Sequence, residues 1–188
     1  MSQIIRCPWC EGDEIYTKYH DEEWGKPLRD NQKLFEFLIL EGAQAGLSWI
    51  TILKRREAYR AVFDNFDPTI IARYDDAKIN SLKLDERIIR NRLKIQSAVN
   101  NAKCFLNMKN SGIDFSKWLW DFVDNQPIKN NFKAMSEIPA VTDTSTRISN
   151  ALKEKGFNFV GPTIMYAYMQ AVGMVNDHLQ TCFRHNEV

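Results

Sequence analysis

Apolar residues recur at helical spacing along most of the 188-residue chain, and no run alternates apolar and polar residues as a half-buried strand does. The stretch after Asp30 is an example, because aspartate is a favoured N-cap and an apolar stripe follows it. That stripe consists of Leu34, Phe35, Phe37, Leu38 and Leu40. A chain with this pattern has no strands from which to build a sheet, so the sequence predicts an all-α fold.

Capping residues, glycines and prolines divide the rest of the chain into further helices. We predict a helix from Ser48, with Ile52, Leu53, Tyr59, Val62 and Phe63 as its stripe, and a short helix over 69–74 behind Asp67 and Pro68. Further helices are predicted over 86–109, from Ser116 through Trp118, Leu119, Trp120, Phe122 and Val123, over 145–155, and from Pro162 to Gly173. Residues 125–141 are predicted to be the least regular stretch, because Pro127 and Pro139 interrupt it.

Composition excludes several classes of protein. The chain has 25 Lys and Arg against 24 Asp and Glu, and its net charge of +1 is no bulk signature of nucleic-acid binding. A polyanionic partner would therefore need positive charge gathered on one face. No run of 18 apolar residues exists, and Met1–Arg6 lacks the apolar stretch of a signal peptide. We therefore expect a cytoplasmic protein with no membrane contact.

Basic residues gather in two places, at Lys54, Arg55, Arg56 and Arg60 and at Arg87, Arg90, Arg92 and Lys94. These residues either hold DNA phosphates or form solvated helix faces, and the sequence leaves both interpretations open. Phosphate contacts would make DNA binding weaken steeply as the salt concentration rises, whereas solvated faces would not.

A glycine-bracketed turn, Gly156–Gly161, separates two of the predicted helices, and Pro162 opens the second of them. Taken alone, Gly156 is a common type of helix C-cap, so an ordinary connection is one interpretation. The arrangement resembles the hairpin of the helix-hairpin-helix DNA glycosylases, in which backbone N–H groups of the turn and of the next helix hold a DNA phosphate. This resemblance implies DNA contacts at Gly156, Val160, Gly161 and Thr163.

That superfamily typically places a catalytic aspartate shortly after the second helix, in a Val-Asp-Thr-His-like stretch. Here the chain reads Val-Asn-Asp-His over 175–178, after Gly173. Asn176 therefore stands at the catalytic position, and Asp177 is one residue out of register. We predict that Asn176 is not a general base. His185, in the tail, is expected at the surface.

Cysteines and histidines lie near both ends of the chain, with Cys7 and His20 at the start and His178 and Cys182 at the end. His178 and Cys182 are spaced i and i+4, so a helix would place both on one face. Two thiolates and two imidazoles would complete a tetrahedral structural zinc site that joins the chain ends. The alternatives are that each is an unrelated residue, that Cys10 replaces Cys7 as a ligand, or that Cys7 and Cys10 form a redox pair.

Six stretches carry a wider resemblance: Arg6–Trp9, Tyr19–Gly25, Leu40–Trp49, Ile88–Arg92, Gly156–Gly161 and Val175–His178. Together they resemble the constitutive 3-methyladenine DNA glycosylase I family, a branch of the helix-hairpin-helix superfamily. The resemblance implies one glycosylase unit over 1–188, with a helix-hairpin-helix core over about 30–175 and a zinc-binding lobe from 1–29 and 176–188. It assigns Cys7, His20, His178 and Cys182 as the zinc ligands, and the family's spacing to His20 favours Cys7 over Cys10.

The implied activity is hydrolysis of the N-glycosidic bond of 3-methyladenine in alkylated duplex DNA by a monofunctional, monomeric enzyme, the first step of base excision repair. The base must be flipped into a pocket to be reached. By resemblance, the aromatic walls of that pocket are Trp9, Tyr16, Tyr19 and Trp49, and Glu41 accepts from the adenine amino group and acts in catalysis with Tyr19. The alternative for Glu41 is a solvated helix-end carboxylate. The Gly46–Leu47 turn is implied to fill the gap left by the base.

The chemistry accounts for the missing aspartate, because methylation at N3 puts positive charge on the base and weakens the glycosidic bond. The departing base, 3-methyladenine, is neutral and needs little protonation, so a tight aromatic pocket suffices. Three other functions stay open: a non-catalytic protein that binds the alkylated lesion, a glycosylase that also releases 7-methylguanine, and a zinc-stabilised helical interaction protein.

Overall fold

The computed structural model describes residues 4–188; Met1–Gln3, part of the N-terminal stretch interpreted above, lie outside the described residues. Over this range the protein is built almost entirely from helices, as predicted. The α-helices are α1 (Glu14–Glu22), α2 (Asn31–Gln44), α3 (Trp49–Leu53), α4 (Arg56–Val62), α5 (Pro68–Ile71), α6 (Asp76–Leu84), α7 (Arg92–Asn110), α8 (Phe115–Trp120), α9 (Asp143–Glu154) and α10 (Pro162–Ala171). Two short strands, β1 (Ile128–Lys129) and β2 (Val175–Asn176), pair in parallel. None of the helices in this range combines the length and the apolar character that crossing a membrane requires.

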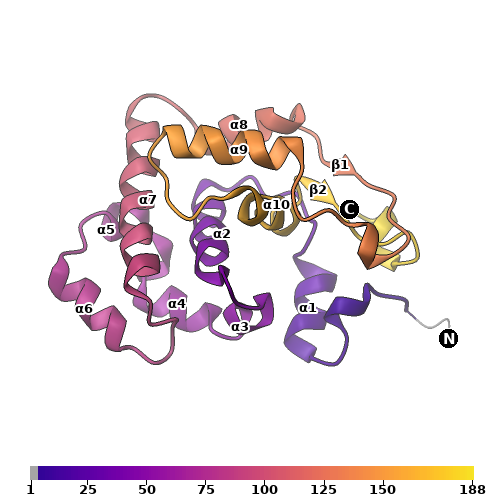
Figure 1. Ribbon diagram of the computed structural model, residues 1–188, viewed down its shortest axis with the longest axis horizontal. Coiled ribbons are helices and arrows are strands. Elements are labelled where there is room, and N and C mark those ends of the chain that lie inside the picture. The colour runs from indigo at the N-terminus through magenta and orange to yellow at the C-terminus, as the bar shows by residue number, and fades with distance from the viewer. Residues whose placement is uncertain (1–3) are drawn as a thin grey trace.

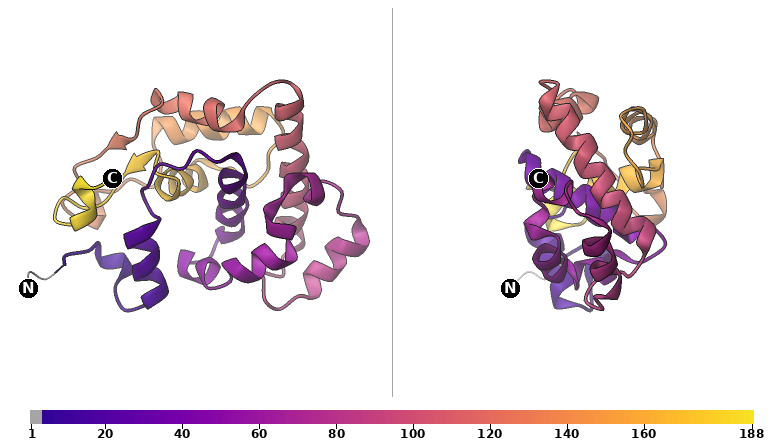
Figure 2. Two further views of the ribbon diagram at one scale, coloured as in Figure 1. Left: turned by 180° about the vertical axis from the view of Figure 1, so that it is seen from behind. Right: turned by 90° about the vertical axis from the view of Figure 1, so that its left-hand side faces the viewer.

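Helix α2 lies in the middle of the fold (Figure 1). Every residue from Leu34 to Ala43 is buried, and a helix buried on all sides must be enclosed by other elements. Helix α10 packs on α2 and α9 covers α10, while α3 and α7 also contact α2. The views in Figure 2 place α1 and the C-terminal segment at the same end of the molecule. The fold therefore surrounds α2 and brings the two chain ends together.

Several predicted helix ends are confirmed. Asp30 and Asp67 each accept a hydrogen bond from a backbone N–H in the first turn of the helix that follows. Gly156 and Gly173 follow α9 and α10 in the left-handed conformation, with φ angles of 88° and 71°. Helix α5 is shorter than predicted and ends at Ile71. Local capping chemistry thus decides where most of these helices begin and end.

The helix predicted over 86–109 begins only at Arg92. Asn91 caps it, because its side chain accepts from the backbone N–H of Lys94. The preceding residues form a connection and, before that, helix α6, which the sequence did not predict. Only Ile79 and Leu82 of α6 are buried, so its apolar stripe is too short to give a helical signal.

Two serines predicted to cap helices do not do so. Ser48 precedes α3 without a side-chain capping bond, and the single helix predicted from it breaks into α3 and α4. Ser116 lies inside α8, where Asp114 is the N-cap. Helix α9 begins at Asp143, slightly earlier than predicted, behind a capping box formed with Thr142.

One continuous cluster of buried apolar side chains joins the central helices to the two chain ends. It includes Tyr19 and Trp24 from the N-terminal segment and Leu179 and Cys182 from the C-terminal segment. The two ends therefore share a hydrophobic core with the helices around α2. The division into a core over 30–175 and a terminal lobe stays a prediction.

The segment after α10 crosses the segment after α1 where no side chain fits between them. The backbone N–H of Gly25 donates to the carbonyl of Gln170. A Cβ atom built on Gly173 would lie 2.2 Å from the carbonyl carbon of Lys26. Gly173 also has a φ of 71°, which L side chains rarely adopt.

Gly173→Ala is therefore expected to lower the free energy of unfolding by about 3 kcal/mol or more, because left-handed strain and a backbone clash act together. Urea denaturation followed by circular dichroism measures the loss. Gly112→Ala is the matched control, since Gly112 has a φ of 78° but open space around its Cβ position. The control is expected to lose about 1 kcal/mol. Equal losses in the two variants would contradict the clash.

Candidate active site and candidate metal centre

A cavity of about 380 Å³ lies among α1, α2, α3, α10 and the connection that precedes α9. The five residues predicted to bind a base, Trp9, Tyr16, Tyr19, Glu41 and Trp49, all line this cavity. They come from the segment before α1, from α1, from α2 and from α3, so only the folded structure brings all of them together. A volume near the lower limit for ligand pockets suits a single base.

Aromatic rings form much of the cavity wall. Trp9 packs edge to face on Tyr16, with ring centroids 4.7 Å apart, and Tyr19 lies 5.6 Å from Trp49. Trp24, which the sequence did not predict, also lines the cavity and lies 5.0 Å from Trp9. Aromatic faces attract both flat rings and cations. The wall therefore favours a flat ligand that is electron-poor or positively charged.

Glu41 brings a carboxyl group into this aromatic cavity. The residue is 3% exposed, and within residues 4–188 its Oε2 atom has no hydrogen-bond partner. Burial raises the pKa of Glu41 from 4.5 to about 8. Burial, followed by the Glu41 carboxyl group, raises the pKa of Tyr19 well above its usual value. A buried carboxyl group without a partner is costly, so this position indicates a ligand that supplies a donor.

Residues that the sequence did not single out complete the cavity. Tyr166 and Gln170 line it from α10, and Met135 and Ile138 line it from the irregular connection before α9. The i and i+4 spacing of Tyr166 and Gln170 is a signal that could have placed both on one face of α10. Met135 and Ile138 lie in a segment without periodicity, so no comparable signal marks them.

A second cavity of about 320 Å³ adjoins the first and reaches the turn between α2 and α3. Glu41, Gln44 and Thr163 line both cavities, and Gly46 and Leu47 line the second. The Leu47 side chain is 40% exposed, and Gly46 turns the chain with a φ of 77°. The turn predicted to enter DNA thus lines a cavity that shares residues with the aromatic cavity.

The turn over 156–161 is held firmly between α9 and α10. Asn101 fixes Asn158 by donating to its carbonyl at 2.9 Å and accepting from its N–H at 2.8 Å. The Val160 side chain is buried, so only its backbone could reach DNA. Gly161 has open space at its Cβ position, whereas a Cβ atom on Gly156 would lie 3.3 Å from the Cys104 Sγ atom. Of these three predicted DNA contacts, Gly156 is exposed, Gly161 is half-buried and Val160 is buried.

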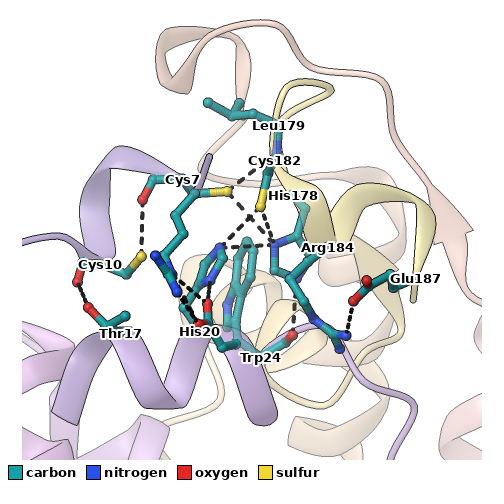
Figure 3. Close-up of polar contacts among 12 residues, drawn as sticks. Cys7, Cys10, Thr17, His20, Trp24, His178, Leu179, Cys182, Arg184 and Glu187 are labelled. Atoms are coloured by element: carbon teal, nitrogen blue, oxygen red, sulfur yellow. Dashed lines mark hydrogen bonds and ion pairs between the residues drawn. The ribbon is translucent and has the colours of Figure 1, made fainter. Parts of the chain in front are cut away.

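The Cys7, His20, His178 and Cys182 side chains converge between the two chain ends (Figure 3). All four are buried, and their ligand atoms lie within 4.8 Å of one another. The Nε2 atom of His20 is 3.2 Å from Nδ1 of His178 and 3.4 Å from Sγ of Cys182, and Cys7 Sγ is 3.8 Å from His178 Nδ1. The edges of a tetrahedral zinc site with these donors measure roughly 3.3–3.8 Å. The donor set and its spacing therefore fit a zinc ion.

The outer nitrogens of both imidazoles are held by the surrounding protein. His20 Nδ1 bonds the Asp21 carboxylate at 2.8 Å, and His178 Nε2 bonds the carbonyl of Trp24 at 3.2 Å. Arg6 in turn donates to Asp21 at 2.8 Å. With their protons on these outer nitrogens, both imidazoles present a lone pair to the centre, as metal-ligating histidines do.

The structure corrects one detail of the predicted metal site and bears on the choice between Cys7 and Cys10. His178 and Cys182 do not share a helix; they follow β2 in a turn in which the Cys182 N–H donates to the carbonyl of Leu179. The Cys10 thiol is not in the cluster and donates to the carbonyl of Cys7 at 3.2 Å. Both cysteines are free thiols, so the geometry favours Cys7 as the ligand and offers no support for a redox pair.

Asn176 holds the end of the chain in place. Its amide nitrogen donates to the carbonyls of His185 and Val188, and its oxygen accepts from the N–H of His178. In the part of the chain that the structure describes, Asn176 is not among the residues that line the aromatic cavity. His185, expected at the surface, is buried with its ring against the carbonyl of Asn130, because the chain end folds back on the connection before α9.

Ion pairs neutralise much of the positive charge of the two groups of basic residues found in the sequence. The pairs are Lys54 with Asp13, Arg56 with Glu23, Arg60 with Glu36 and Glu57, Arg87 with Asp85, and Arg90 with Glu86. Lys94 instead donates to the carbonyls of Ala43 and Ala45, at the end of α2. These contacts give most of the basic residues a role within the protein.

Comparison with known proteins places this site in context. The chain matches the family described as methyladenine glycosylase over residues 9–185. It is 49% identical to DNA-3-methyladenine glycosylase 1 of Escherichia coli K12, over 94% of this chain and 95% of that protein. A crystal structure of a 3-methyladenine DNA glycosylase I aligns with a TM-score of 0.94 at 48% identity, covering 95% of this chain and 98% of that one. A tyrosine-to-phenylalanine variant of 3-methyladenine DNA glycosylase I, in complex with 3-methyladenine, aligns with a TM-score of 0.91 at 36% identity, covering 95% of this chain and 96% of that one.

Proposed function

Because the chain belongs to the methyladenine glycosylase family, we propose that it hydrolyses the N-glycosidic bond of 3-methyladenine in alkylated duplex DNA. The observation that carries this proposal is the Glu41 carboxyl group, buried in an aromatic cavity and unpartnered within the described range 4–188. The Escherichia coli relative is named for a glycosylase of this kind, and a structural relative forms a complex with 3-methyladenine.

Recognition follows from the groups that line the cavity. The base must leave the duplex to enter it, so base flipping precedes the chemistry. Glu41 then accepts a hydrogen bond from the exocyclic amine of adenine, where guanine has a carbonyl acceptor instead. Two acceptors that face each other leave a buried group unpaired, so discrimination against guanine is expected to be steep. The rings of Trp9, Tyr16, Tyr19 and Trp49 enclose the base.

The reaction needs no general acid. The electrons of the bond between C1′ and N9 pass to the cationic base as it leaves, so neutral 3-methyladenine is released. Water adds its hydroxyl group to C1′ and loses a proton, which leaves an abasic site and begins base excision repair. The charge of the bound base favours the ionised form of Glu41, beside Tyr19, and the two act together on the developing charge.

Asn176→Ala is expected to keep single-turnover excision within about tenfold of the unchanged protein, since Asn176 holds the chain end rather than the cavity. Loss of its hydrogen bonds is expected to lower the free energy of unfolding by about 2 kcal/mol. Kinetics on methylated DNA, at a temperature where circular dichroism shows the variant folded, measure the first effect. A loss of roughly 10²-fold or more would assign Asn176 the role of a general base.

We propose that DNA is held by two turns beside the cavity, in a helix-hairpin-helix arrangement. Leu47, exposed next to the second cavity, fills the space that the flipped base leaves in the stack. Gly161, the N-cap of α10, has no side chain to occupy the first N–H groups of that helix, so these groups and Thr163 are placed to hold a phosphate. Such contacts predict binding that weakens as the salt concentration rises.

We also propose that Cys7, His20, His178 and Cys182 hold one structural zinc ion. The spacing of the four ligand atoms and the outward hydrogen bonds of both imidazoles support this assignment. Four protein ligands leave no open coordination position, so zinc would supply stability and no reaction chemistry. It would join the segment before α1 to the segment after β2.

Base release from methylated duplex DNA tests the proposed function, with the freed purines separated by chromatography. We expect 3-methyladenine without 7-methylguanine. Release of both bases would keep the glycosylase activity and contradict the selectivity assigned to Glu41. Tight binding to methylated DNA without base release would instead support a lesion-binding protein, the alternative that Asn176 motivates.

A further inference from the structure

A second buried carboxyl group lies behind the wall of the aromatic cavity. Asp177 is 1% exposed and accepts hydrogen bonds from the Tyr166 hydroxyl at 2.7 Å, from Gln170 Nε2 at 2.8 Å and from Asn130 Nδ2 at 2.7 Å. Tyr166 and Gln170 line the cavity, whereas Asn130 approaches from the segment after β1. The proposed chemistry gives Asp177 no role, although it stands one residue from the position of the superfamily's catalytic aspartate.

Among the described residues, the side chains that bond Asp177 include no cation that would balance its charge. Its three partners are two amide groups and a hydroxyl, which satisfy a carboxylate without neutralising it. Neither Asp177 nor Glu41 takes part in any ion pair formed within residues 4–188. Two buried carboxyl groups thus flank one cavity, in a low-dielectric region where charges act strongly.

Tyr166 and Gln170, which lie between Asp177 and the cavity, transmit the effect of the Asp177 charge to the cavity. Burial, and then the Asp177 carboxylate, raise the pKa of Tyr166 above its usual range. The Tyr166 hydroxyl therefore keeps its proton and donates a hydrogen bond to Asp177. The same carboxylate accepts from the nitrogen of the Gln170 amide, so the oxygen of this cavity-lining side chain is not used in that bond. A donor bonded to an anion is polarised, so its remaining lone pairs become more negative.

We propose that Asp177 is a specificity-determining residue of this cavity, whose charge acts through Tyr166 and Gln170 to favour cationic N-alkylated bases over neutral bases of the same shape. The inference rests on the proposed function, and the property of the substrate that this side of the cavity recognises is its positive charge. Asp177 does not touch the base, so it is a positioning residue. During bond cleavage the positive charge moves from the base to the sugar, and the neutral product no longer benefits from the field.

Asp177→Asn tests this proposal because it removes the charge and keeps the shape. Asparagine can present its oxygen to Tyr166 and Gln170 if Asn130 turns its amide round. We expect kcat/KM on duplex DNA with cationic 3-methyladenine to fall about tenfold, mainly through a higher KM. The Kd for duplex DNA with 3-deaza-3-methyladenine, a neutral base of the same shape, is expected to change less than about twofold, since a neutral base feels little of the field.

Asn130→Ala is the matched control. It removes the third hydrogen bond to the same carboxylate, from outside the cavity, so it is expected to lower stability without changing the preference for the cationic base. Equal losses of Asp177→Asn on the cationic and neutral DNAs, or no loss on either, would overturn the proposal and leave Asp177 with a structural role.

Gln170→Met keeps the proposal testable if Asp177→Asn, next to His178, does not fold. It removes the Gln170 amide, through which the charge of Asp177 acts on the cavity. The variant is therefore expected to have a smaller preference for the cationic base, as Asp177→Asn does. An unchanged preference in a folded Gln170→Met variant would overturn the proposal. If the unchanged protein releases no 3-methyladenine, the proposed function is contradicted. If the unchanged protein releases 3-methyladenine and Asp177→Asn keeps the full preference for the cationic base, only the role of Asp177 is contradicted.

Discussion

Glu41→Gln is expected to lower kcat/KM for 3-methyladenine release by about 10²- to 10³-fold. Glutamine keeps the shape of the side chain but removes its charge, and its NH₂ group can turn toward the amine of the base. Within the described residues nothing else bonds the Glu41 Oε2 atom, so the substitution disturbs no internal contact there that could explain a loss of activity. Single-turnover release of the base from methylated duplex DNA measures the effect.

The same substitution is expected to change stability in the opposite direction. Burial raises the pKa of Glu41 from 4.5 to about 8, so between these values the unfolded chain has lost a proton that the folded chain keeps. The contribution of Glu41 to stability is therefore complete below pH 4.5 and is lost as the pH rises through about 8. Glu41→Gln removes this dependence, and above pH 8 its free energy of unfolding is expected to exceed that of the unchanged protein by a few kcal/mol.

Glu36→Gln is the matched control, because Glu36 is also buried on α2 but pairs with Arg60 at 2.7 Å. Its substitution breaks an ion pair outside the cavity, so we expect lower stability and a kcat/KM within about twofold of the unchanged protein. Similar activity losses in the two variants would show that a carboxyl group on α2 supports the fold rather than the base.

The sequence predicts the fold best where local chemistry decides the outcome. Asp30 and Asp67 cap helices because an aspartate at that position satisfies backbone N–H groups, whatever packs around it. Ser116 has the same capping chemistry, yet Asp114 lies two positions earlier and takes the N-cap. Helix α6 buries only Ile79 and Leu82, so its formation depends on packing against α7 and leaves little trace in the sequence.

The candidate site likewise has residues that the sequence predicts and residues that only the folded structure reveals. The resemblance to a known family leads to Trp9, Glu41 and Trp49, and the structure places them around one cavity. The same cavity is also lined by Met135, from a connection without periodicity, and its position depends on contacts between distant segments. Residue type alone could not separate Cys7 from Cys10; the folded backbone does, because the Cys10 thiol is bonded to a carbonyl outside the cluster.

Removal of the proposed zinc ion is expected to lower Tm by about 10 °C or more. An ion present at 1,000 times its Kd stabilises the folded state by about 4 kcal/mol, and each kcal/mol shifts the Tm of a chain of this size by about 2–4 °C. The effect is large because the ligands lie at both ends of the chain, and without the ion four buried polar groups face one another. Thermal unfolding followed by circular dichroism, with and without a chelator, measures the shift.

Matched cysteine variants separate loss of the metal from loss of packing. Cys182→Ala removes a proposed ligand, so it should bind less zinc, unfold at a lower temperature and no longer respond to a chelator. Cys10→Ala removes a buried thiol close by that lies outside the ligand set, so it should keep both the metal and the chelator response. If the purified protein contained no metal and chelator left its Tm unchanged, the four side chains would be held by their hydrogen bonds alone. The joining of the chain ends would then depend on the backbone crossing at Gly173 and on the contacts of Asn176.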